Sequence, residues 1–254
     1  MSPQTTNPPT ESRVSTRISL RWLPEPASET TDTLVMSVKG WYVDLRVDKN
    51  SGQIDWAIAG QRVVDSQELR RVQFTHELDS HNSFDAVDCG TFTTLANGDD
   101  LETGSMPRPD VPGAPMTEYE EVWRELTFRE GPEGPGKGVS WVLESKYEVG
   151  IGEGEVEVAR TFLARVWGTY LVVRQKQIHT RSEETGGIVV KDGGDVSARR
   201  EEWDGSSGWV AKYVLGAEGK ELPSAQNIQV QGSPGETAIV QGQPYIIRSF
   251  EDIV

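Results

Sequence analysis

The feature that most constrains this fold is the alternation of apolar and polar residues along many short segments. In "DTLVMSVKGWYVDLRV", residues 32–47, apolar side chains occupy every second position on both sides of Gly40. Such period-two alternation is typical of β-strands that bury one face, and the glycine marks a hairpin turn. Segments of this kind recur at short intervals, and none shows the periodicity of a helix of three turns. The sequence therefore predicts an all-β protein.

A repeat within the chain indicates how these strands are arranged. "VKGWYVDLRV", residues 38–47, and "VWGTYLVVRQ", residues 166–175, share Val, Gly, Tyr and Arg at matching positions, and Glu121 and Glu201 form a weaker match further along. Self-similarity at this scale is typical of duplicated units. Closure into barrels removes free sheet edges, and these strands are too many for one small barrel. We predict two related barrels in tandem.

The domain boundaries follow from turn-rich and disorder-prone segments. "REGPEGPGKG", residues 129–138, has the Gly and Pro content of a linker. The N-terminus, "MSPQTTNPPTES", is rich in Pro, Thr and Ser and is expected to be disordered. We predict an N-terminal arm at 1–15, a first barrel at 16–130 and a second barrel at 131–254.

Charge and cysteine content limit the partners and the compartment. The chain has 25 Lys and Arg against 40 Asp and Glu, a net charge of −15, which repels nucleic acids and anionic membrane surfaces. No stretch has the roughly 18 apolar residues of a membrane helix, and the N-terminus has no features of a secretion signal. Cys89 is the single cysteine, so no internal disulfide can form. We expect a cytoplasmic location, with the nucleus as an alternative.

Several longer motifs resemble a known family. "ISLRWLPEP", "IDWAIAG", "FTHELDS", "LANGDDLETGSMPRPD" and "YEEVWREL" occur in this order around the alternating segment of residues 32–47. Over residues 16–126 they resemble the fungal family named for a yeast casein-kinase-interacting protein, and the second half follows more loosely. The resemblance implies two lipocalin-like antiparallel barrels and a fungal, intracellular origin. It implies no settled activity, and the kinase association of one member need not extend to this chain.

Sequence motifs for cofactors and metals fail on inspection. "GPEGPGKG", residues 131–138, is close to a phosphate-binding loop, but it ends in Gly138 and leads into a strand rather than a helix. The three histidines, His76, His81 and His179, are too few for a zinc site of three or four ligands. We therefore expect no cofactor and no metal, so that any chemistry would rest on proton transfer and positioning.

Strand alternation places two groups of polar and aromatic side chains together. Tyr42, Asp44 and Arg46 share one face of their strand, and Tyr119, Glu121 and Trp123 share one face of another. These faces are either solvated or directed into the lumen of the first barrel, which has room for one small ligand. In the second case the catalytic candidates are Asp44 and Glu121 as acids, with Arg46 and Tyr42 orienting the substrate. The candidates for substrate binding are Trp41, Trp56, His76, Tyr119 and Trp123.

Three functions remain open from the sequence. The first is a cofactor-independent cyclase or isomerase of fungal secondary metabolism, which would add a phenol hydroxyl to a prenyl alkene of a small aromatic substrate. The second is a non-catalytic adaptor for a protein kinase or another protein, with the Pro-rich loop at 105–117 as its contact. The third is a passive carrier of a hydrophobic molecule.

Overall fold

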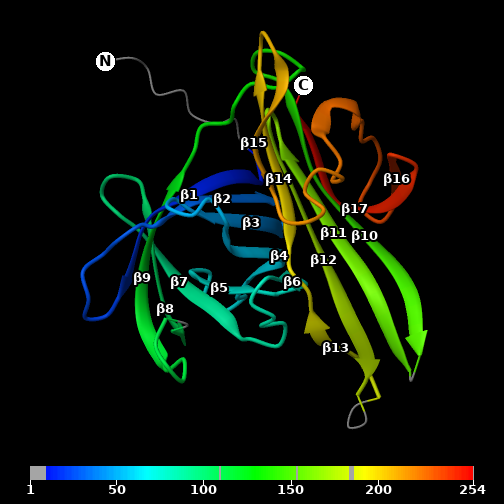
Figure 1. Ribbon diagram of the computed structural model, residues 1–254. Coiled ribbons are helices and arrows are strands. Elements are labelled where there is room, and N and C mark those ends of the chain that lie inside the picture. Colours follow the sequence, from blue (N-terminus) through cyan, green and yellow to red (C-terminus); the bar gives the residue numbers. More distant parts are fainter. Residues whose placement is uncertain (1–9, 109, 153, 183–185, 254) are drawn as a thin grey trace.

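The computed structural model describes residues 10–108, 110–152, 154–182 and 186–253, and β-strands dominate it (Figure 1). The prediction of an all-β protein is confirmed. The strands of the first half are β1 (Ser12–Trp22), β2 (Thr31–Val38), β3 (Trp41–Asp48), β4 (Ile54–Val64), β5 (Arg71–Phe74), β6 (Leu78–Asp79), β7 (Asp88–Thr94), β8 (Asp100–Pro107) and β9 (Met116–Glu125).

The first half closes into an antiparallel barrel of eight strands. The strand order runs β3-β2-β1-β9-β8-β7-β5-β4, and the pairing of β3 with β4 completes the circle, while β6 adds to β4. Closure leaves no free edge among these eight strands, as the sequence predicts. β1 begins at Ser12, so residues 12–15 belong to the barrel and not to the predicted arm, while residues 1–9 lie outside the described residues.

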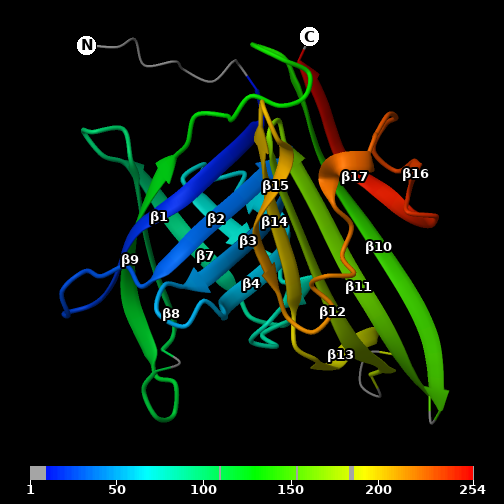
Figure 2. The same cartoon turned by 45° about the horizontal axis from the view of Figure 1, so that its top comes forward.

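The second half forms a separate sheet (Figure 2). Its strand order is β15-β14-β12-β11-β10-β17-β16, with β13 paired to β12. No pairing between β15 and β16 closes it among the described residues, so this second barrel-like unit is open. Its elements are β10 (Gly138–Gly152), β11 (Glu155–Val166), β12 (Thr169–Arg181), β13 (Ile188–Gly193), β14 (Ser197–Asp204), β15 (Gly208–Leu215), the 3-10 helix η1 (Ala225–Asn227), β16 (Thr237–Val240) and β17 (Gln243–Ile253).

The repeated segments form equivalent hairpins in the two units. Val38 pairs with Trp41 across the turn at Lys39-Gly40, and Val166 pairs with Thr169 across the turn at 167–168. The weaker match, between Glu121 and Glu201, has no structural counterpart. Glu121 lies on β9, next to β1 and β8, whereas Glu201 lies on β14, next to β12 and β15.

The two sheets pack against each other through their apolar faces. On β3, the side chains directed into this contact are those of Val43, Leu45 and Val47. They share one apolar cluster with Phe162 of β11 and Leu171 of β12. These side chains alternate with those that face the barrel lumen, so the same strand separates an apolar contact from a polar interior.

The far face of the second sheet is covered by its own chain. Residues 216–236, between β15 and β16, lie on the side away from the barrel in both views (Figures 1 and 2). From this segment Leu222, Ala225, Ile228 and Val230 pack with Trp141 and other side chains of the sheet. No helix of the described residues is long and apolar enough to cross a membrane.

Candidate functional site

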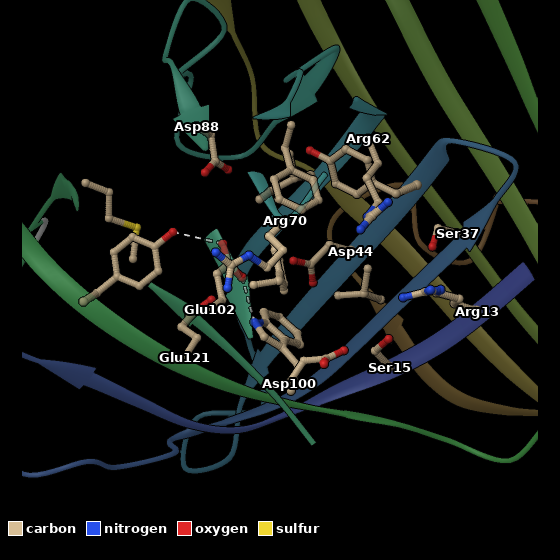
Figure 3. Close-up of a pocket in the computed structure, with 18 of the residues that line it drawn as sticks. Arg13, Ser15, Ser37, Asp44, Arg62, Arg70, Asp88, Asp100, Glu102 and Glu121 are labelled. Atoms are coloured by element: carbon tan, nitrogen blue, oxygen red, sulfur yellow. Dashed lines mark hydrogen bonds between the residues drawn. The ribbon is translucent and has the colours of Figure 1, made fainter. Parts of the chain in front are cut away.

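The interior of the first barrel contains a cavity of about 510 Å³. This volume lies in the range of sites for small organic ligands. Its wall combines aromatic, acidic and basic side chains, which Figure 3 shows directed into a common space. The lining residues come from all eight strands of the barrel, so its closure brings together segments that are far apart in the sequence.

A chain of buried ion pairs crosses the wall between β3, β9 and β1. The Arg46 guanidinium donates to Asp44 Oδ2 at 2.9 Å and to Glu121 Oε1 at 3.5 Å. Arg17 donates to the same Glu121 oxygen at 2.5 Å. Burial opposes the charge on Arg46, but Asp44 and Glu121 raise its pKa above the ordinary value. Two arginines therefore share one carboxylate, which fixes Glu121 as a structural centre of the wall.

Asp44 is incompletely satisfied in this network. Its Oδ1 atom is buried and accepts no hydrogen bond from the described residues, although the side chain lines the cavity. Burial raises the pKa of Asp44, and the nearby Arg46 only partly opposes the shift. A buried acceptor without a donor is unfavourable, so Oδ1 is available to a hydrogen-bond donor that enters the cavity.

Glu102 is a buried carboxyl group of the wall that has neutral hydrogen-bond donors and no basic partner among the described residues. It accepts hydrogen bonds from the Tyr119 hydroxyl at 3.0 Å and from Trp123 Nε1 at 2.8 Å, and no arginine or lysine of the described chain forms an ion pair with it. Burial, together with the negative charges of Glu121 and Asp88, raises its pKa to about 8. Glu102 therefore carries a proton at neutral pH, as a general acid requires.

Two glycines make room for this carboxyl group and its partner. A Cβ atom at Gly90 would lie 2.2 Å from Glu102 Oε1, and a Cβ atom at Gly104 would lie 2.7 Å from the Tyr119 hydroxyl oxygen. Both glycines are inside strands, where glycine is unfavourable unless a close approach requires it. The barrel wall is thus shaped around Glu102 and Tyr119.

Aromatic rings form the rest of the wall. The Arg46 guanidinium lies 4.7 Å from the ring centroid of Trp56 and 5.7 Å from that of Trp123. Tyr42 and Phe74 meet edge to face with centroids 5.4 Å apart. These contacts hold the rings in place, so the apolar part of the cavity is formed before any ligand enters.

A histidine connects the wall to the second sheet. His76 Nδ1 lies 2.8 Å from Asp79 Oδ2, and its Nε2 lies 3.1 Å from Asp88 Oδ2. Burial opposes the charge on His76, but the two carboxylates raise its pKa to about 9. Gln175 of β12 donates to the Asp79 backbone carbonyl at 2.7 Å. Asp88 lines the cavity, so His76 orients one of its wall carboxylates.

Most of the residues that the sequence analysis singled out line this cavity: Tyr42, Asp44, Arg46, Trp56, Tyr119, Glu121 and Trp123. Trp41 does not. It alternates with Tyr42 and therefore points to the other side of β3, where it stacks on Phe162 with centroids 6.2 Å apart. His76 is not part of the cavity wall either, because it lies behind Asp88.

Sequence reasoning missed Glu102, Asp88 and the arginines at positions 13, 62 and 70, which also line the cavity. The alternation in "DLETG", residues 100–104, carries a usable signal, because it places Asp100 and Glu102 on the same face as Gly104. For the arginines, strand alternation alone gives no preference between the lumen and the solvent. In the part of the chain that the structure describes, no group of three or more His, Cys, Asp or Glu side chains is placed to hold a metal ion.

Comparison with known proteins finds a family model and a solved structure that match most of the chain. A family model described as Protein HRI1 matches residues 13–244. Among solved structures, the crystal structure of an uncharacterized protein from Saccharomyces cerevisiae, YLR301w, is similar with a TM-score of 0.63 at 18% identity. The match covers 95% of this chain and 99% of the yeast chain, and at this identity it bears on the fold alone. The comparison with curated proteins finds no match.

Proposed function

The chain belongs to the fungal HRI1 protein family, and we propose that its first barrel is a cofactor-independent cyclase or isomerase that acts on a small prenylated aromatic molecule of secondary metabolism. The observation that carries the proposal is the burial of three carboxyl groups, Asp44, Glu102 and Glu121, in the wall of an aromatic cavity. Burying carboxyl groups is unfavourable unless each has partners, and a passive hydrophobic carrier gains nothing from them.

The environments of the three carboxyl groups suggest different roles. Glu121 is held by Arg17 and Arg46 and acts as the structural anion of the wall. Glu102 keeps its proton at neutral pH and is the best candidate for the general acid. Asp44, with its unpartnered oxygen, is the second candidate. This assignment moves the principal acid from Asp44 or Glu121, the choices made from the sequence, to Glu102.

The proposed reaction is a ring closure that needs no outside electrons. Glu102 donates its proton to one carbon of the prenyl alkene, and the other carbon becomes a tertiary cation. The phenol oxygen then forms a bond to this cation, and the phenolic proton returns to the Glu102 carboxylate. The product is an isomer of the substrate, so the residues of the cavity suffice for the chemistry. The π faces of the aromatic wall favour the cationic intermediate.

The test is a titration of tryptophan fluorescence with prenylated aromatic polyketides, followed by chromatography of each mixture. Trp56 and Trp123 line the cavity and are expected to report binding by quenching. Glu102→Gln should lower turnover at least about 100-fold while leaving quenching in place, because glutamine keeps the shape but has no acidic proton. Asp44→Asn should lower turnover by a smaller factor.

Glu120→Gln is the matched control. Glu120 neighbours Glu121 on β9, points away from the cavity and pairs with Arg21 at 3.1 Å, so its substitution should leave turnover unchanged. Saturable quenching with no new product would contradict the enzyme and favour a carrier. Full activity of Glu102→Gln would contradict the assignment of the acid.

A further inference from the structure

We propose that one side of the cavity binds an anionic group of the ligand between Arg13 and Arg62, so that the substrate is an aromatic molecule bearing a carboxylate or a similar anion. The inference rests on the proposed function in one respect, because it concerns the same cavity and names the class of molecule that enters it. It adds a recognition subsite opposite the carboxyl groups.

The first observation is that the guanidinium groups of these arginines have no partner. Arg13 of β1 and Arg62 of β4 both line the cavity, and neither guanidinium group forms an ion pair or a hydrogen bond with any described residue. Most arginines elsewhere in this acidic chain are paired with carboxylates, as Arg17 is with Glu29 and Arg124 is with Asp99. In a chain of net charge −15, a half-buried Arg62 without a carboxylate partner calls for an explanation.

The second observation is that the two cations affect each other. Burial lowers the pKa of Arg62, the charge on Arg13 lowers it further, and the charges of Glu102 and Asp100 only partly oppose these effects. Asp100 is engaged elsewhere, since it accepts a hydrogen bond from the Thr94 hydroxyl at 2.8 Å. An anion between the two guanidinium groups would relieve their repulsion and gain charge-assisted hydrogen bonds.

The third observation is the presence of neutral donors at the same place. Ser37 lies directly across from Arg13 in the pairing of β1 with β2, and Ser15 follows two residues after Arg13 on the same face. Neither hydroxyl group takes part in a hydrogen bond with another described side chain. Guanidinium groups flanked by free hydroxyls form the donor set that a carboxylate, sulfonate or phosphate accepts from.

The two arginines and the two serines lie together in the cavity, apart from three of its carboxyl groups. Figure 3 shows Arg13, Arg62, Ser15 and Ser37 on one side and Asp88, Glu102 and Glu121 on the opposite side. Phe74 is the cross-strand partner of Arg62, and it provides an aromatic surface beside the anion subsite. A ligand held by its anion at the arginines would extend its apolar part toward Glu102, where the proposed acid lies.

Two dyes that differ in a single group test this subsite. 8-Anilinonaphthalene-1-sulfonate carries a sulfonate, and N-phenyl-1-naphthylamine is the same ring system without it. Both fluoresce on entering an apolar cavity, so their dissociation constants can be measured by titration. The double variant Arg13→Met/Arg62→Met should weaken the sulfonate dye at least about tenfold and change the neutral dye less than about twofold, because methionine keeps an apolar stem without the charge.

Arg71→Gln is the control, because Arg71 is on β5 close to the site but is not part of the cavity wall. It should change neither dissociation constant by more than about twofold. Thermal unfolding of the double variant checks the fold, and its midpoint should not fall, because both substitutions remove unpaired charges. Equal binding of the sulfonate dye by wild type and double variant, with the neutral dye still bound, would overturn the anion subsite alone. Failure of both dyes to bind the wild type would overturn the subsite and the ligand-binding cavity together.

Discussion

In the first barrel, β7 joins β5 to β8 and closes a hollow interior, whereas in the second sheet no strand of the described residues joins β15 to β16. The order of the other strands is the same, because β5-β4-β3-β2-β1-β9-β8 corresponds to β15-β14-β12-β11-β10-β17-β16. In the second unit, residues 216–236 pack on the face that corresponds to the lumen of the first barrel. The same strand order therefore forms a hollow barrel in one half of the chain. In the other half it forms an open sheet whose corresponding face is covered by residues 216–236.

The residues at equivalent positions follow this difference. The pairing of the repeated hairpins makes Tyr42 equivalent to Tyr170, and it places Trp141 and Val172 where the first barrel has Arg13 and Asp44. Trp141 and Val172 are fully buried in the apolar cluster of the second unit. Polar residues line the interior that stays hollow, and apolar residues line the interior that the chain fills. We infer that the first barrel is kept open for a ligand.

Substitutions at one equivalent pair, Asp44 and Val172, should differ most in their effect on stability. Val172→Asp would place a carboxyl group in the apolar cluster without a donor, and we expect it to destabilise the protein by about 4 kcal/mol or more, enough to prevent folding at 37 °C. Asp44→Asn should change the stability by less than about 1 kcal/mol, because the amide oxygen can still accept the hydrogen bond from Arg46 and the polar cavity wall accommodates the amide group. Urea unfolding measures both.

A milder variant keeps this comparison measurable if Val172→Asp yields no folded protein. Val172→Thr has nearly the same shape and adds one hydroxyl group, so it should lower the free energy of unfolding by about 1–2 kcal/mol. Equal losses at positions 44 and 172 would contradict the distinction between a hollow and a filled interior.

The sequence was sufficient to predict the all-β fold and the first barrel. For Tyr42, Asp44 and Arg46, a position facing the barrel lumen was one of two interpretations. Alternation has only two phases, so it can sort side chains into faces but cannot say which face is inside. This limit explains the error at Trp41, which belongs to the opposite phase of the same strand and packs on the second sheet. It also explains why the open second unit was unforeseen, since closure depends on one strand, β7, without a counterpart.

The next effect concerns two buried glutamates, one in each unit. Glu102 has a pKa of about 8 against an ordinary value of 4.5, so the folded protein binds this proton more tightly than the unfolded chain. Stability therefore falls as the pH rises from about 4.5 to about 8. Glu102→Gln cannot ionise and should remove this fall, making the variant more stable than wild type by on the order of 4 kcal/mol at pH 9 and nearly equal at pH 4.5.

Glu201 provides the contrast in the second unit. It accepts hydrogen bonds from Ser224 and from the Ala225 backbone amide, at 2.9 and 2.8 Å, and so holds the segment that fills this unit. Glu201→Gln should therefore destabilise the protein by about 1–2 kcal/mol at neutral pH, opposite in sign to Glu102→Gln at high pH. Urea unfolding at pH 5, 7 and 9 measures both variants. The same sign for both at pH 9 would contradict different roles for the two glutamates.

Removing the hydroxyl groups of the two tyrosines of the repeat should change the free energy of unfolding least, and by different amounts. Tyr42 donates its hydroxyl proton to the Thr75 carbonyl at 3.0 Å, and Tyr170 donates to the Pro223 carbonyl at 2.9 Å. Tyr170→Phe leaves the Pro223 carbonyl without this donor in a filled interior and should destabilise by about 1–2 kcal/mol. Tyr42→Phe should cost less than about 0.5 kcal/mol, because water in a hollow cavity can replace the lost donor. Thermal and urea unfolding compare the pair, and a larger loss at Tyr42 would mean that the first interior is dry and closed to a polar ligand.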